Sequence, residues 1–175
     1  MGQIKKPNPV IVFVGLLAGR KDWLNEGIKR LETSFASPKL MSPIWTFEKT
    51  DYYTEEMGPG LLRQFVAWGK LVEPSELARM KIKTNALEDE LADAIRGPVK
   101  RPVNLDPGYI TPSKLILATT KDYSHRIYLG EGIYAEVTLQ WSKGQWRSWP
   151  WTYPDYAEPT YHEFFTRVRQ ALLEK

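Results

Sequence analysis

The chain has 175 residues with an apolar fraction of 42%, which is enough for one domain with a buried core. It contains no cysteine, which excludes disulfides, thiolate zinc sites and a cysteine nucleophile. The net charge is +3, and the 24 basic and 21 acidic residues are interspersed, so charge alone does not indicate a nucleic-acid-binding protein. We therefore expect a single domain over residues 1–175.

The N-terminal segment predicts a cytoplasmic protein. It has no long apolar core and no small-residue cleavage site, unlike a secretory signal. The apolar run at residues 10–18 is too short to cross a bilayer, so no membrane partner is expected.

The first 110 residues alternate between strand and helix patterns. Some stretches are continuously apolar or alternate with period two, and others have apolar residues at helical spacing. In chain order we expect a strand at 10–17, a helix at 22–37 capped by Asp22, strands at 43–47 and 61–72, a helix at 74–96, and a strand at 103–105 that ends in a turn at 106–108. This order is typical of a ferredoxin-like βαββαβ unit, which we assign to residues 1–110.

Residues 111–157 predict an antiparallel β-meander followed by an aromatic segment. A glycine-rich turn at 130–132 pairs Tyr128 with Tyr134, and a turn at 143–144 pairs Trp141 with Trp146. Alternation places the apolar residues 127, 129, 133, 135, 137, 139 and 141 on one face and a polar set, including the cross-strand pair of residues 126 and 136, on the other. Residues 111–117 fit either a short helix or a strand.

Residues 158–175 predict a C-terminal helix. Thr160 and Glu163 form a capping box, and the buried stripe consists of Tyr161, Phe164, Phe165, Val168 and Leu172. The expected fold class is α+β: a ferredoxin-like βαββαβ unit extended by an antiparallel β-meander and a C-terminal helix.

Polar and aromatic side chains concentrate in three turn-rich segments, near residue 51, at 106–109 and at 121–126. We expect these segments to wall one pocket for an anionic ligand, such as a nucleotide, a phosphate or a nucleic-acid end, because Lys, Arg and hydroxyl groups bind phosphate and carboxylate well. The candidate ligand-binding residues are Asp51, Tyr53, Tyr109, Lys114, Thr120, Lys121, Ser124, Arg126 and Tyr128.

A second hypothesis assigns chemistry to the same pocket. His125 is a candidate general acid or base, with Asp106 or Asp122 orienting it; the alternative is a buried core histidine, since alternation places it on the apolar side. Asp51, Asp106 and Glu136 could supply oxygen ligands to a divalent metal. Together these residues would form a metal-assisted phosphoester or nucleotide hydrolase.

Aromatic residues suggest further alternatives. Phe13 and Trp68 lie on strands that loosely resemble RNA-recognition motifs, so RNA is a possible partner, but both also fit a core. The aromatic segment at 149–156 could pack as a lid, stack a base or sugar, or serve as a protein-interaction module. The glycine-containing stretch at 15–22 lacks the spacing of a P-loop.

Several motifs spread over nearly the whole chain resemble an uncharacterised bacterial family known only as a domain of unknown function, DUF 4416. The resemblance is carried by P-V-I-V-F-V-G-L-L, T-D-Y-Y-x-E-E-M-G-P-G from Thr50, N-L-D-P-G-Y from Asn104, A-T-T-K-D-Y-S-H-R-I-Y-L-G from Ala118, G-I-Y-A-E-V-T-L from Gly132 and W-T-Y-P-D-Y from Trp151. It implies no established activity, cofactor or catalytic residue.

Overall fold

The computed structural model describes residues 2–48 and 53–175. Within these residues, nine strands form one sheet in the order β2-β4-β1-β5-β6-β8-β7, with β3 beside β4 and β9 beside β8. The elements are β1 (Val10–Ala18), α1 (Lys21–Phe35), β2 (Leu40–Met41), β3 (Trp45–Phe47), α2 (Thr54–Met57), β4 (Leu61–Val72), η1 (Pro74–Glu76), α3 (Leu77–Ile95), β5 (Val103–Ile110), β6 (Lys114–Thr119), β7 (Ile127–Gly130), β8 (Ile133–Ser142), β9 (Gln145–Ser148) and α4 (Pro159–Leu173). Every pairing is antiparallel, so the fold is mixed α and β around a large antiparallel sheet.

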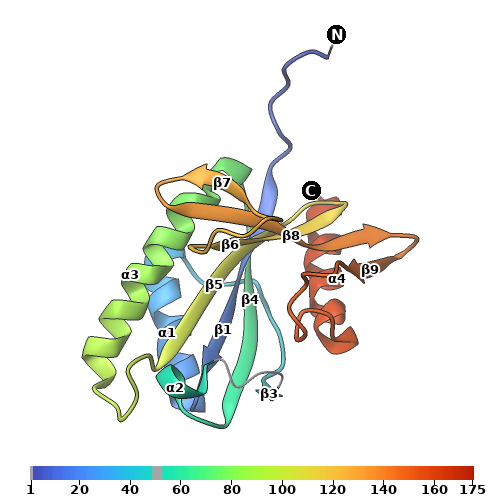
Figure 1. Ribbon diagram of the computed structural model, residues 1–175. Helices are drawn as coiled ribbons and strands as arrows, with labels where there is room; N and C mark the ends of the chain where they lie inside the picture. Colours follow the sequence, from blue (N-terminus) through green and yellow to red (C-terminus); the bar gives the residue numbers. More distant parts are fainter. Residues whose placement is uncertain (1, 49–52) are drawn as a thin grey trace.

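The sheet is the middle of three layers (Figure 1). α1 and α3 cover one face, where they pack on alternate residues of β1 such as Val14 and Leu16. α4 covers the other face, where it packs on the intervening residues, including Ile11 and Phe13. Because β1 is buried on both faces, its sequence is a continuous apolar run.

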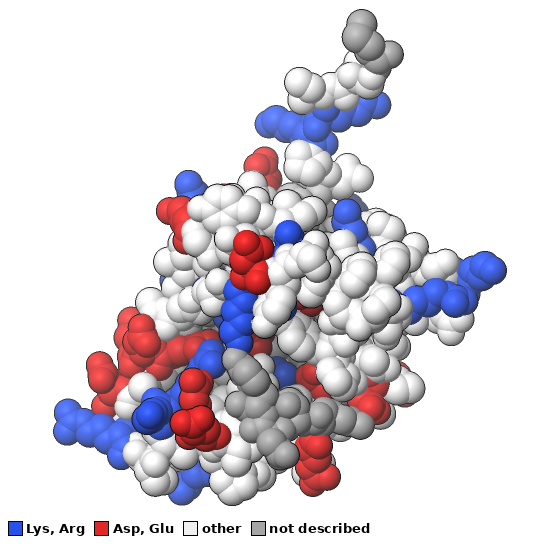
Figure 2. Space-filling view, in the orientation of Figure 1, with Lys and Arg blue, Asp and Glu red and all other residues white. Residues whose placement is uncertain are grey.

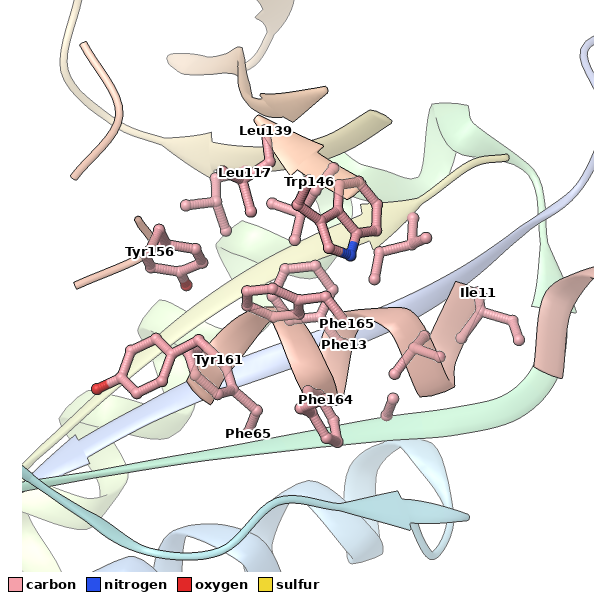
Figure 3. Close-up of a cluster of buried hydrophobic side chains, with 14 of the residues drawn as sticks. Ile11, Phe13, Phe65, Leu117, Leu139, Trp146, Tyr156, Tyr161, Phe164 and Phe165 are labelled. Atoms are coloured by element: carbon pink, nitrogen blue, oxygen red, sulfur yellow. The ribbon is translucent and has the colours of Figure 1, made fainter. Parts of the chain in front are cut away.

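The core under α4 combines aromatic rings with aliphatic side chains (Figure 3). Phe165 lies with its ring centroid 5.5 Å from Phe13 and 5.0 Å from Phe65. The buried stripe predicted for the C-terminal helix is confirmed in full. The predicted capping box is wrong: the helix begins at Pro159, so Thr160 already lies inside its first turn. Proline suits this position because it has no N–H that a helix would leave unpaired.

α1 begins one residue before the predicted cap. Asp22 lies in its first turn and pairs with Arg20 at 2.9 Å instead of capping the helix. No helix within residues 2–48 and 53–175 is long and apolar enough to cross a membrane.

The turn predicted at residues 106–108 is wrong, because β5 continues through Pro107 to Ile110. β6 pairs with β5 only over 108–110, so Pro107 has no strand partner on the side away from β1, where sheets tolerate proline. A Cβ on Gly108 would lie 2.7 Å from the Phe13 ring and closer still to the carbonyl oxygen of Ile116. Glycine therefore permits the close approach of β5 and β6 at this point.

Beyond the pair Gly108–Leu117, β5 and β6 separate. β5 continues beside β1 as far as Val103, whereas β6 continues beside β8 as far as Thr119 (Figure 1). We call this divergence the fork. Among residues 2–48 and 53–175, no strand pairs with β5 or β6 in the space that opens between them.

One predicted hairpin register is confirmed in full and the other only in part, because Gly130, which was predicted to lie in the turn at 130–132, itself pairs with Ile133 after a register shift. Tyr128 pairs with Tyr134, and Trp141 pairs with Trp146. Residues 114–119 form β6, so the strand alternative was right for this segment and the helix was wrong.

The prediction of one apolar face for the meander is wrong. A bulge in β8 places the extra residue Thr138 between Val137, which pairs with Ile116, and Leu139, which pairs with Leu115. Val137 consequently packs on the α3 side, while Leu139 joins the core under α4. Ile127, predicted on the same apolar face, is 71% exposed on the edge strand β7.

Candidate functional site

A cavity of about 710 Å³ opens at the fork, within the usual range for small-molecule sites. We call it the fork cavity. Much of its lining lies on the α4 side of the sheet, because Leu117 and Tyr156 belong also to the core under α4, while Lys81 of α3 reaches it from the opposite face. The lining also includes Phe47, Tyr53, Glu56, Arg63, Lys81, Arg101, Asn104, Asp106, Ala118, Thr119, Thr120, Lys121, Tyr123, His125, Arg126, Glu136, Trp151, Tyr153, Pro154 and Asp155.

Asp106 of β5 is the carboxylate at the centre of one polar cluster. Lys81 of α3 donates to it from 3.2 Å, and the Asn104 amide donates to its other oxygen from 2.5 Å. Burial would raise the pKa of Asp106, but the charges of Lys81 and Arg63 and the Asn104 hydrogen bond outweigh it and hold that pKa below its usual value. Asp106 is therefore ionised at neutral pH.

A chain of hydrogen bonds orients this cluster. Arg101 donates to Glu88 at 2.7 Å and to the side-chain oxygen of Asn104, so the Asn104 amide nitrogen is turned toward Asp106. Glu88 in turn accepts from the backbone N–H of Leu105 at 2.7 Å. The asparagine orientation and the position of the Asp106 carboxylate are thus fixed by β5 and α3 together.

Glu136 of β8 is the centre of a second cluster. It accepts from Arg126 at 2.8 Å and from the Thr138 hydroxyl at 3.1 Å, and His125 Nε2 lies 3.3 Å away. The predicted pair of Arg126 and Glu136 is confirmed, but both side chains are buried, so it differs from a surface ion pair. Since a carboxylate only accepts, His125 holds its proton on Nε2 when neutral and leaves Nδ1 as an acceptor.

Arg63 of β4 forms a buried ion pair with Asp155, 2.9 Å away. Burial opposes its charge, but the Asp155 carboxylate raises the pKa of Arg63, so the guanidinium remains charged. Its Nε and Nη1 atoms have no hydrogen-bond partner among residues 2–48 and 53–175, and neither does the Tyr156 hydroxyl. Buried N–H and O–H groups without a hydrogen-bond acceptor are uncommon in proteins, so a bound ligand or water could supply the acceptor here.

The aromatic segment at 149–156 closes one side of the fork cavity. Trp151 donates its indole N–H to the Val137 carbonyl at 3.0 Å, and Thr152 donates to the Thr138 carbonyl at 2.6 Å. Both carbonyls lie at the β8 bulge, so the bulge supplies the attachment points for this segment. Tyr153 accepts from Arg126 at 2.8 Å and links the segment to the second cluster.

The rings of this wall stack on one another. His125 lies 5.1 Å from Trp151 and 6.1 Å from Tyr123, each at 14°, and Trp151 lies 5.3 Å from Trp149 at 1°. The Arg126 guanidinium covers Tyr123 at 4.6 Å. These contacts occupy part of the ring faces of His125, Trp151 and Tyr123.

The structure brings many of the predicted site residues together. Those in the fork cavity are Tyr53, Asp106, Thr120, Lys121, His125, Arg126 and Glu136. Others lie elsewhere: Tyr109 points to the α1 and α3 side, Lys114 is exposed at the far end of β6, Ser124 is exposed, and Tyr128 packs on Tyr134 at the sheet edge. Asp51 lies outside the described residues.

Sequence reasoning missed several polar residues of the cavity. Lys81 and Arg63 lie on elements with an apolar sequence pattern, Arg101 precedes β5, and Asn104 lies at the start of β5. A signal was present for Lys81, because it follows Leu77 by four residues and so falls on the buried stripe of its helix. A charged residue at such a position requires a partner inside the fold.

Two ligands were predicted from the sequence, a metal ion and RNA, and each can be compared with the residues that the structure describes. Among residues 2–48 and 53–175, no group of three His, Cys, Asp or Glu side chains is placed to hold a metal ion. The sequence basis for RNA binding is lost, because Phe13 is buried under α4 and Trp68 is buried against Phe35 of α1. Neither ring can stack a base.

The charge on the face shown in Figure 2 does not indicate a polyanion partner. Basic and acidic side chains are intermingled on the face shown in Figure 2, without a broad area of one sign. Phosphate-backbone binding by a nucleic-acid-binding protein relies on such an area.

The comparison with known sequences covers nearly the whole chain. The model of the family described as "Domain of unknown function (DUF4416)" matches residues 8–172, which span β1 through α4. No curated protein and no solved structure matches the chain. The chain therefore belongs to the DUF4416 family.

Proposed function

We propose that the fork cavity binds a small anionic molecule. The observation that carries this proposal is the convergence of basic side chains from separate parts of the chain on one cavity: Arg63 from β4, Lys81 from α3, Arg101 from the segment before β5, and Lys121 and Arg126 from the segment after β6. Basic groups with nearby hydroxyls bind phosphate and carboxylate oxygens through charge-assisted hydrogen bonds.

Acidic side chains in the same cavity support the proposal by holding the basic ones in place. Asp106 pairs with Lys81, Glu136 with Arg126, and Asp155 with Arg63. Side chains fixed in this way do not have to be ordered when a ligand arrives, which lowers the entropic cost of binding. The orphaned N–H groups of Arg63 add positive potential at the base of the cavity.

Lys121 and Lys114 provide a matched test. Both are exposed lysines at opposite ends of the 114–121 segment, but only Lys121 lines the cavity. We expect inorganic phosphate, pyrophosphate or citrate to raise the melting temperature and to alter tryptophan fluorescence, since Trp151 lies in the lining. Lys121→Ala should weaken anion binding by roughly tenfold, the size of one charge-assisted hydrogen bond.

The Lys114→Ala variant is the control and should bind the anions as the wild type does. Equal weakening in both lysine variants would indicate a general charge effect. Absence of any response to phosphate, pyrophosphate, citrate and nucleotides in the wild type would refute an anion site.

A second candidate function is hydrolysis of a phosphoester or nucleotide, and one observation favours it. His125 lies between a buried carboxylate and the cavity, an arrangement that fixes its tautomer and lets it exchange a proton. Chromogenic phosphoesters assayed with and without magnesium and manganese would test this function. Activity should be lost in His125→Ala, and turnover that survives both this change and Asp106→Asn would exclude the assignment.

The remaining predictions need separate tests. Metal assistance rests on Asp51, Asp106 and Glu136, of which Asp51 lies outside the described residues. The aromatic segment as a protein-interaction module, and a cytoplasmic location, stay predictions. For the fold, the strand order β2-β4-β1-β5 with α1 and α3 on one face supports the proposed ferredoxin-like unit.

A further inference from the structure

We infer that the ligand of the fork cavity is a hydroxylated anion, such as a sugar phosphate, and that Asp106 binds its hydroxyl groups. This inference rests on the proposed anion site and names the class of molecule that would occupy it. It depends on which polar groups a ligand can reach and on which ring faces are already covered.

Most charged side chains of the cavity are covered by the protein itself. Side-chain exposure is 1% to 6% for the covered group, which comprises Glu136, Arg63, Arg126, Asp155 and Lys81. It is 30% for Arg101, 24% for Asp106 and 20% for His125. A ligand therefore meets Arg101, Asp106 and His125 together with the exposed Lys121, while the covered group positions Asp106 and His125.

The groups within reach include two acceptors. Asp106 is ionised, and a carboxylate offers more lone pairs than its bonds to Lys81 and Asn104 occupy. His125 has Nδ1 as an acceptor when its Nε2 proton is directed to Glu136. An anion without donors would face repulsion from the carboxylate, so a ligand must bring hydroxyl or amino donors to this side.

Nucleobases are the other common donors attached to phosphate, but they require an open ring face. His125 stacks with both Tyr123 and Trp151, and Trp151 stacks also with Trp149. Base recognition by stacking is worth about 1–3 kcal/mol per base and is the usual source of its affinity. With His125 and Trp151 engaged in this stack, hydroxyl groups are the donors that the Asp106 side of the cavity suits best, alongside the threonine hydroxyls at 119 and 120.

The test compares phosphates that differ only in what they carry. Binding of inorganic phosphate, hexyl phosphate, glycerol 3-phosphate, ribose 5-phosphate, glucose 6-phosphate and AMP is measured by calorimetry on the full chain. We expect at least one sugar phosphate to bind about tenfold or more tightly than hexyl phosphate, because its hydroxyls satisfy charged acceptors. AMP should bind no more tightly than ribose 5-phosphate.

The Asp106→Asn variant removes the charged acceptor with little change in shape, and Asp122→Asn is its control on the neighbouring exposed loop. The advantage of the sugar phosphate over hexyl phosphate should disappear in Asp106→Asn and persist in Asp122→Asn. Asp106→Asn should bind inorganic phosphate at least as tightly as the wild type, because the repulsion from the carboxylate is removed, and this result would show that the cavity is still folded.

Three results would overturn the inference. They are equal binding of every sugar phosphate and hexyl phosphate, a sugar advantage that survives in Asp106→Asn, and a tenfold gain for AMP over ribose 5-phosphate. In each case inorganic phosphate still binds and the anion site stands. Failure of all six probes, inorganic phosphate included, would instead refute the proposed function together with the inference.

Discussion

Two regions on the same face of the sheet have opposite character. Under α4, where β5 and β6 are paired, the space is filled by rings such as Phe13, Phe65 and Phe165. Past Gly108, where β5 and β6 separate, the same face is lined by charged groups around a cavity. The comparison shows that strand separation, rather than a change of face, converts this surface from core to candidate site.

The physical reason lies in what each region can pack against. A paired sheet presents a continuous surface on which a helix buries apolar side chains at interior density. At the fork, polar side chains of β5 instead find partners on α3 and the 101–104 segment, as Asp106 does with Lys81 and Asn104. Burial of charge is acceptable there because each charge is paired.

The largest expected effect is at the paired end. Phe165→Ala removes a fully buried ring that contacts Phe13 and Phe65, and we expect a loss of about 3–5 kcal/mol in the free energy of unfolding. Urea denaturation measures it, with Leu173→Ala on the exposed end of α4 as the control. A loss below about 1 kcal/mol would mean that this core is not close-packed.

An intermediate effect is expected at the boundary itself. Gly108→Ala places a Cβ against the Ile116 carbonyl oxygen and the Phe13 ring, so β5 and β6 must move apart, at a cost of about 1–3 kcal/mol. Hydrogen exchange of the amides in β6 should accelerate, because its pairing with β5 begins at this residue.

Gly19→Ala is the matched control for the boundary. A Cβ at Gly19 would have its nearest neighbour, the Met57 carbonyl oxygen, at an ordinary 3.5 Å, so the change should be nearly neutral. If Gly108→Ala were equally neutral, the close approach of β5 and β6 at Gly108 would not be needed for their pairing.

The smallest expected effect is a pH-dependent change in stability, which we expect at the fork cavity and not in the core under α4. Because the pKa of folded Asp106 is below its usual value, its contribution to stability is complete above the unfolded pKa near 4 and is lost as pH falls through the folded value. Asp106→Asn should cost about 1 kcal/mol at neutral pH. That difference from the wild type should shrink below about pH 4.

Urea denaturation at several pH values checks this behaviour. The cost of Phe165→Ala should stay constant over the same range, since no titrating group is removed. A cost of Asp106→Asn that also stays constant at acid pH would contradict the ionised state assigned to Asp106.

Part of the candidate site could be predicted because its residues are dense in short segments. His125 and Arg126 stand one after the other, and the hairpin register alone placed Arg126 opposite Glu136. The meeting of these residues with Asp106 could not be derived, because it depends on β6 lying between β5 and β8. Arg63 was missed for the same reason, since its partner Asp155 is 92 residues away.

The sequence by itself determined the local features of this protein. Trp141 stands opposite Trp146 because Lys143 and Gly144 adopt the positive φ angles that a two-residue hairpin turn needs. The buried stripe of α4 likewise follows from helical spacing alone. Both features involve residues close together in the chain, where periodicity and turn chemistry leave one solution.

Only the tertiary structure decided where the polar space would lie. The bulge at Thr138 reverses which side chains in the second half of β8 face α4, and the fork past Gly108 separates β5 from β6. Both arise from pairing between strands that contact several neighbours at once, so no local pattern specifies them. The charges at the fork are tolerated because segments distant in the chain supply their partners, and those partners exist only once the sheet has formed.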